Sequence, residues 1–140
     1  MKAGDSRYSK CVYFSSNALA RKIEKMATDA WKRVSLSPSH AYLLMMVLDE
    51  PGIQPGALVK ELLLTPSTIT RLIDKLVEKK LVKRTAKGKV INVYPTLRAK
   101  TLQPQLNICR DEFYENYTSK LGREESDKLA QAINKITDKI

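Results

Sequence analysis

Hydrophobic residues recur at three- and four-residue spacing along much of the chain, a pattern that predicts amphipathic helices. The first predicted helix covers about residues 8–34. A second is expected over residues 38–49, because Ser37 can cap it and Pro38 suits the first helical position. A short third helix is predicted over residues 55–62, where it again opens on a proline.

The fourth predicted helix has the clearest start signal. Thr65 can accept a backbone N–H of the first turn, and Pro66 lies where its missing donor has no consequence. Helical spacing predicts an apolar inner face made of Ile69, Leu72, Ile73, Leu76 and Val77. It predicts a polar outer face made of Ser67, Thr68, Thr70, Arg71, Asp74, Lys75 and Glu78.

The pattern changes after Leu81 to short runs rich in Val, Ile and Thr. Residues 82–85 and 89–94 read as two strands joined by a tight connection around Lys87 and Gly88. Gly88 can adopt the positive φ that short hairpin turns require. A two-stranded β-hairpin is therefore expected in an otherwise helical chain.

Two helices are predicted to complete the chain, one ending near Leu121 with a bend or restart at Pro104, and one over residues 123–140. These two helices and the first helix carry apolar stripes. The small central part of the chain offers no obvious surface against which the stripes could pack. Burial against a second copy of the chain is the simplest solution, and folding back onto the chain's own core is the alternative.

The positive charge of the chain is concentrated in one region. The net charge is +10, and residues 59–100 hold eleven Lys or Arg against three acidic residues, which gives +8. Such a surface favours a polyanionic partner, although a solvated lysine-rich exterior is the simpler alternative. The longest apolar run, residues 41–48, is far shorter than the roughly 20 residues of a membrane span, so no membrane partner is expected.

The residues that usually carry chemistry are scarce. The chain has one histidine, His40, and two widely separated cysteines, Cys11 and Cys109. No nucleophile, base and acid set can be assembled around a single histidine, and no metal-ligand spacing is present. We therefore expect no enzyme activity, no cofactor and no metal, and two unpaired thiols favour a cytoplasmic location.

The start of the fourth helix suits the major groove of DNA, which admits one α-helix whose N-terminal residues reach the base edges. Short hydroxyls allow close approach, and an arginine can hold a guanine or clamp a phosphate. An ordinary amphipathic surface helix is the alternative interpretation. The predicted DNA-binding residues of this helix are Thr65, Ser67, Thr68, Thr70, Arg71 and Lys75.

The predicted hairpin adds a second basic element. A narrow charged tip can follow the DNA backbone or enter the minor groove, whereas the alternative is a basic edge that discourages aggregation. Its predicted DNA-binding residues are Arg84, Lys87, Gly88 and Lys89.

The segment LTPSTITRLIDKLVEKKLVKR resembles the recognition helix and first wing strand of the MarR family of winged helix-turn-helix transcription regulators. The resemblance implies one domain over residues 1–140, with a DNA-binding lobe over 37–96 and helical dimerisation segments over 1–36 and 97–140. The expected fold is mainly α with a small β-hairpin wing. The resemblance also implies a homodimer that binds a pseudo-palindromic DNA operator. A repressor is the simpler expectation, because occlusion of a promoter requires only binding.

The chain departs from the family pattern at the wing. Family members usually have an Asp-x-Arg wing tip, where this chain has Lys87, Gly88 and Lys89, and Ala99 stands where a glycine is usual. A lysine lacks the planar fork of arginine, so minor-groove reading at this tip is the least secure part of the resemblance.

The resemblance further implies a small-molecule effector that binds where the dimerisation helices meet the DNA-binding lobe. Trp31, His40 and Tyr42 are the candidates to line that site, with core packing as the alternative for each. Cys11 and Cys109 of different subunits would form a switchable disulfide in a redox-controlled regulator, and incidental thiols are the alternative. A winged-helix module that binds protein is the remaining alternative function.

Overall fold

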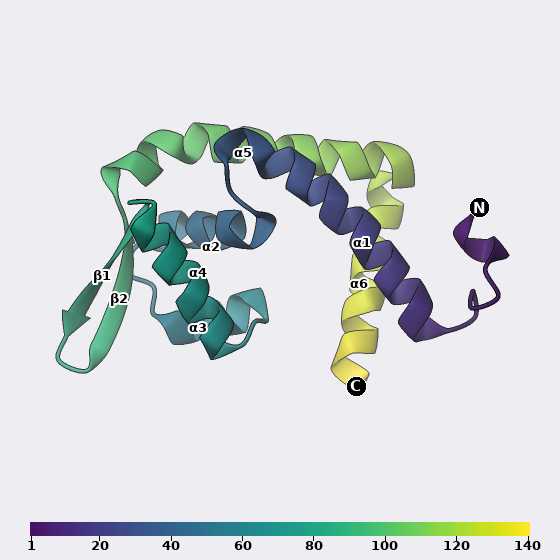
Figure 1. Ribbon diagram of the computed structural model, residues 1–140, viewed down its shortest axis with the longest axis horizontal. Coiled ribbons are helices and arrows are strands. Elements are labelled where there is room, and N and C mark those ends of the chain that lie inside the picture. Colours follow the sequence, from purple (N-terminus) through teal and green to yellow (C-terminus); the bar gives the residue numbers. More distant parts are fainter.

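The computed structural model describes residues 1–140 and consists of helices with one β-hairpin at the edge of the molecule (Figure 1). Two 3-10 turns, η1 (Ala3–Asp5) and η2 (Lys32–Val34), flank the first long helix. The hairpin strands are β1 (Val82–Lys87) and β2 (Val90–Pro95). The α-helices are α1 (Val12–Trp31), α2 (Pro38–Asp49), α3 (Pro55–Leu62), α4 (Pro66–Glu78), α5 (Leu97–Leu121) and α6 (Arg123–Lys139).

The helix starts follow the local capping chemistry. The Ser37 side chain accepts the backbone N–H of His40 at the start of α2, and the Thr65 side chain does the same for Thr68 in α4. The first helix is shorter than predicted, because residues 8–10 form turns and η2 replaces its last turn.

The restart predicted at Pro104 does not occur, since α5 is continuous from Leu97 to Leu121. A proline inside a helix leaves the carbonyl four residues earlier, here that of Lys100, without its usual donor. Both residues lie on the exposed side of α5, where water can supply the missing hydrogen bond.

A compact lobe is formed by α2, α3, α4 and the hairpin, and its core continues under α1 and α5. The hairpin is tied to the lobe by a bridge in which Val93 N–H donates to the Ile53 carbonyl, with N and O 2.9 Å apart. The inner face of α4 is buried as predicted at four positions, while Val77 is 37% exposed and was wrongly assigned to that face. Val77 lies at the edge of the apolar stripe, so only part of its side chain reaches the core.

The wing turn lies one residue later than predicted. Lys87 pairs with Val90 as the last residue of β1, which leaves Gly88 and Lys89 as the two turn residues. Gly88 has φ of +60°, the left-handed conformation that such a turn requires.

The remaining helices extend away from the lobe. In Figure 1, α5 runs across the top, α6 descends from its far end, and α1 slants from below α5 across the front of α6. Trp31 is fully buried where α1, α2 and α5 meet, with its ring 5.2 Å from that of Tyr42 and 5.4 Å from that of Phe113. The apolar stripe of α6 stays exposed, at Leu129, Ile133, Ile136 and Ile140.

Candidate nucleic-acid interface

The N-terminal turn of α4 is a network of hydroxyl groups. The Thr65 Oγ1 lies 3.3 Å from the backbone N of Thr68, from which it accepts a hydrogen bond. The same oxygen lies 2.8 Å from Thr68 Oγ1 and 3.3 Å from Ser67 Oγ. These contacts place several hydroxyls together at the positive end of the helix dipole, where an anionic group is favoured.

The outward face of α4 presents the predicted recognition residues to solvent. Ser67, Thr70, Arg71 and Lys75 are exposed and Thr68 is half-buried, because the apolar face fixes how the helix is turned. The Arg71 guanidinium has no carboxylate partner and only a long contact, 3.4 Å, to Thr68 Oγ1. Its charge is therefore free to meet a phosphate or a base edge.

Two of the predicted residues already have protein partners. Lys75 Nζ lies 3.6 Å from a Glu78 carboxylate oxygen, an exposed pair that a phosphate can readily replace. Arg84 pairs with Asp74 and reaches the Thr70 carbonyl at 3.5 Å, so it connects β1 to α4. The sequence predicted that Arg84 binds DNA and did not reveal Asp74 as its ion-pair partner.

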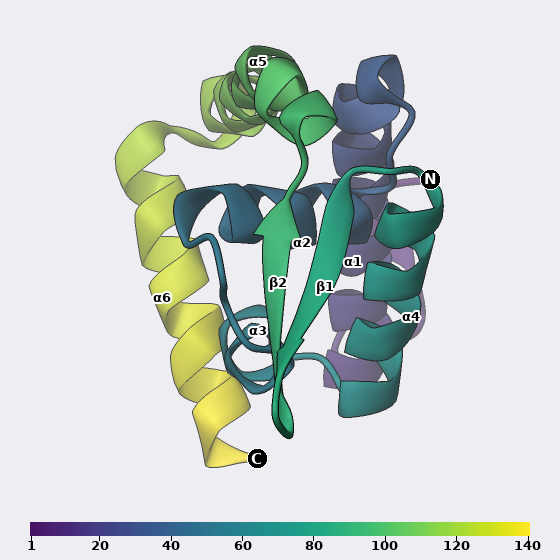
Figure 2. The same ribbon diagram turned by 90° about the vertical axis from the view of Figure 1, so that its left-hand side faces the viewer.

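The wing tip keeps its cations free. Lys87 and Lys89 are exposed and take part in no ion pair of the structure. Figures 1 and 2 show the wing tip and the N-terminal end of α4 at the same end of the lobe. The helix and the wing therefore form one basic, hydroxyl-rich surface, here called the α4–wing surface.

The part of the chain that contains this surface is similar to a known protein family. Residues 34–89 match the sequence model of the MarR family. This part of the chain is therefore similar to the MarR family. No curated protein sequence matches the chain significantly.

Several solved structures share the fold, among them that of a MarR-family transcriptional regulator. A Listeria monocytogenes regulator complexed with a 26mer DNA has a TM-score of 0.75 at 19% identity, covering 92% of this chain and 88% of its own. The S. aureus MepR–DNA complex has a TM-score of 0.79 at 18% identity, covering 91% and 96% respectively. The repressor CouR bound to p-coumaroyl-CoA has a TM-score of 0.83 at 17% identity, covering 97% and 98%. These likenesses establish a winged helix-turn-helix fold over nearly the whole chain.

The three predicted effector residues do not line one cavity. A cavity of about 500 Å³, here called the α1–α2 cavity, lies among α1, α2, α3 and Phe113 of α5, and Tyr42 lines it. Trp31 does not line it; its side chain is fully buried, and its Nε1 has no hydrogen-bond partner. His40 instead faces the Ser37 hydroxyl, 2.5 Å from its Nδ1, in the first turn of α2. The cavity also exposes two carboxylates that the sequence did not single out, Glu24 and Glu61.

Two titratable groups near these elements are perturbed. Burial, and secondarily the positive charges of Lys79 and Lys75, lower the pKa of His40 below its ordinary 6.5. Burial is the main cause that raises the pKa of the Cys109 thiol, which disfavours the reactive thiolate. Cys11 is exposed and the two thiols are not bonded to each other, so a disulfide between subunits stays a prediction.

The remaining features concern metals and membranes. No three or more His, Cys, Asp or Glu side chains gather in a group suited to hold a metal ion. No helix combines the length and apolarity needed to cross a membrane.

Proposed function

We propose that this protein is a sequence-specific repressor that binds a pseudo-palindromic operator as a homodimer and is released by a small molecule. The observation that carries the proposal is the α4–wing surface, where the unpaired Arg71 and the hydroxyls of α4 share one end of the lobe with the wing lysines. A helix end of this kind fits the major groove, and the lysines fit phosphates on either side of it. DNA complexes of two proteins with the same fold support a DNA partner.

The homodimer is supported by the apolar surface outside the lobe. The exposed stripe of α6 (Leu129, Ile133, Ile136 and Ile140) continues toward the exposed Leu19 of α1, and the two helices share an apolar groove with α5. Water contact of this much apolar surface is unfavourable, and a two-fold axis would bury it on both subunits at once. We assign residues 1–36 and 97–140 to dimerisation and residues 37–96 to DNA binding.

The α1–α2 cavity is the candidate effector site. It is lined by helices of both the lobe and the dimerisation segments, so a bound molecule would affect the angle between them. A ligand changes DNA affinity only if it binds one of the two arrangements more tightly. The ligand-bound structure of CouR, which has the same fold, supports a small-molecule effector.

The assignment of Arg71 is tested with an operator selected from random duplex DNA by the unmodified protein. Arg71→Ala should abolish specific protection of that operator, because Arg71 is exposed and contributes nothing to the core. Lys135→Ala, which removes one exposed charge from the polar side of α6, is the matched control and should bind normally. A folded, dimeric Arg71→Ala protein that still protects the same operator would exclude Arg71 from base recognition.

A further inference from the structure

The α1–α2 cavity is negatively charged in a chain whose net charge is +10. Glu24 of α1 and Glu61 of α3 line it, and no Lys, Arg or His does. Neither carboxylate takes part in an ion pair of the structure, although 25 Lys and Arg residues are available in the chain. Two carboxylates that line one space without a protein partner favour a cation in that space.

Two aromatic rings belong to the lining of the same cavity. Tyr42 reaches it from α2 and Phe113 from α5. Both rings pack against the fully buried Trp31, at centroid distances of 5.2 Å and 5.4 Å, and this packing fixes their positions. Burial raises the pKa of Tyr42 above its ordinary 10.0, so its phenol stays uncharged at neutral pH. The face of an uncharged aromatic ring attracts a cation.

The size of the cavity suits a small organic molecule. Its volume of about 500 Å³ lies within the range of about 300–1,000 Å³ found for small-molecule sites. Ile23, Leu62 and Leu64 are half-buried and complete its apolar walls. The two carboxylates are exposed, so a charged group beside them keeps its contact with water while an apolar body attached to it is enclosed.

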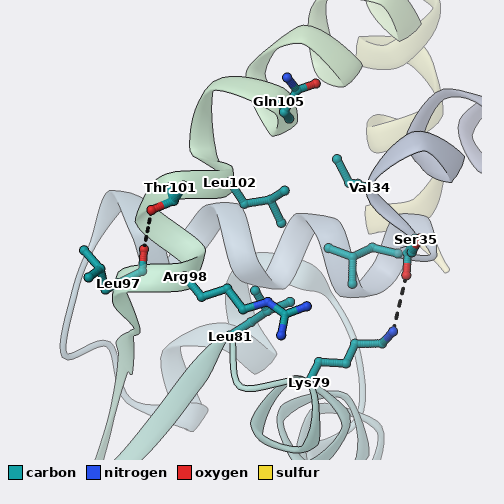
Figure 3. Close-up of a pocket in the computed structure, with 10 residues that line it drawn as sticks. Val34, Ser35, Lys79, Leu81, Leu97, Arg98, Thr101, Leu102 and Gln105 are labelled. Atoms are coloured by element: carbon teal, nitrogen blue, oxygen red, sulfur yellow. Dashed lines mark hydrogen bonds between the residues drawn. The ribbon is translucent and has the colours of Figure 1, made fainter.

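A larger cavity, of about 680 Å³, has the opposite charge. It lies at the C-terminal end of α4, where Lys79 and Arg98 line it and no acidic residue does (Figure 3). We call it the Lys79–Arg98 cavity. Its two positive side chains repel a cation, so charge alone distinguishes the α1–α2 cavity from it.

We propose that the α1–α2 cavity binds an organic cation with an aromatic body, which lies against Tyr42 and Phe113 while its positive charge is held by Glu24 and Glu61. The proposal names the ligand class of the candidate effector site, and its regulatory part rests on the proposed function. Glu24 belongs to α1 and Glu61 to α3 of the lobe. A cation that contacts both carboxylates therefore stabilises one arrangement of the lobe relative to α1.

The test is isothermal titration calorimetry of the full-length protein with 2-naphthylmethylammonium as the probe. The alcohol 2-naphthylmethanol has the same apolar body without the charge, and tetramethylammonium has the charge without the ring. We expect the probe to bind and both comparators to bind about tenfold more weakly, because each lacks half of the recognition. Absence of probe binding, or equal affinity for either comparator, would overturn the proposal.

Glutamine variants test the role of the carboxylates. Glu24→Gln and Glu61→Gln should each weaken probe binding about threefold and together about tenfold, while binding of the alcohol stays the same. Both side chains are exposed and keep their size, so the fold should be unaffected. Glu50→Gln is the matched control, because Glu50 is exposed, forms no ion pair and does not line the cavity. Unchanged probe affinity in the double variant would contradict the proposal.

Two tryptophan variants locate the bound cation. Ser39→Trp fills the α1–α2 cavity and should abolish probe binding, whereas Thr101→Trp fills the Lys79–Arg98 cavity and should leave it unchanged. Both side chains are exposed, so neither change should disturb the core. The reverse result would place the probe in the other cavity and refute the proposal.

The effect on DNA is a separate readout. Fluorescence anisotropy of a labelled operator, measured with and without the probe, reports whether the bound cation changes DNA affinity. If the probe binds in the α1–α2 cavity and operator affinity stays the same, the ligand class is supported and the effector role in the proposed function is refuted. If the probe does not bind while the protein still protects its operator, the inference fails and the DNA-binding part of the proposed function stands.

Discussion

Lys89 lies at the second residue of the two-residue wing turn, and its removal should change the salt dependence of DNA binding. Its side chain is exposed, it packs against no core residue, and no carboxylate neutralises it. Lys89→Ala therefore removes one free charge from each subunit without disturbing the hairpin, whose turn depends on Gly88. If the wing meets DNA in the proposed dimer, two phosphate contacts are lost together.

The expected size follows from counterion release. Each phosphate neutralised contributes about 0.9 to the slope of log affinity against log salt, so two lost contacts reduce the slope by about 1.8. Between about 50 mM and about 200 mM salt, a fourfold change, the wild-type protein should lose about twelvefold more affinity than Lys89→Ala. Lys89→Arg keeps the charge and should keep the slope.

The measurement is fluorescence anisotropy of a labelled operator duplex at a series of salt concentrations. Lys135→Ala serves as the charge control, because it lowers the net charge equally but lies on α6, away from the α4–wing surface (Figure 1). An unchanged slope for Lys89→Ala would mean that the wing tip does not touch phosphate. A reduced slope for both variants would attribute the effect to net charge rather than to contact.

Two further predictions concern stability and are measured by urea unfolding. Thr65→Ala should lower the free energy of unfolding by about 1 kcal/mol, since it removes the cap that accepts from Thr68, while Thr65→Ser retains it; equal stability of the two variants would show that the cap contributes nothing. His40 has a folded pKa below 6.5, so the unfolded state takes up the proton more readily, and the free energy of unfolding should fall as pH drops through 6.5. His40→Asn lacks this titrating group, so its free energy of unfolding should fall less than that of the wild-type protein as the pH drops below 6.5. If the free energy of unfolding of the wild-type protein does not fall in this range, the pKa of His40 is not lowered in the folded state.

The elements that were predicted correctly are those whose signals lie within a few residues. Ser37 and Thr65 cap their helices through backbone groups three residues away, and both prolines that follow them stand in the first helical turn. The apolar face of α4 likewise follows from spacing alone, because a helix repeats every 3.6 residues. Two predictions were wrong at the boundaries of these elements. Val77 borders the apolar stripe of α4 and is partly exposed, and the wing turn lies one residue later than the position of Gly88 indicated.

The amino-acid sequence by itself determined the order of helices and hairpin, the outward face of α4 and the resemblance to the MarR family. These features depend on backbone hydrogen bonds and apolar spacing over short separations. Only the tertiary structure decided that Arg84 pairs with Asp74, that Arg33 meets Glu112 across 79 residues, and that Lys79 and Arg98 face one cavity. Each of these depends on how packed elements are oriented in space, and orientation is set by the whole core at once rather than by any local pattern.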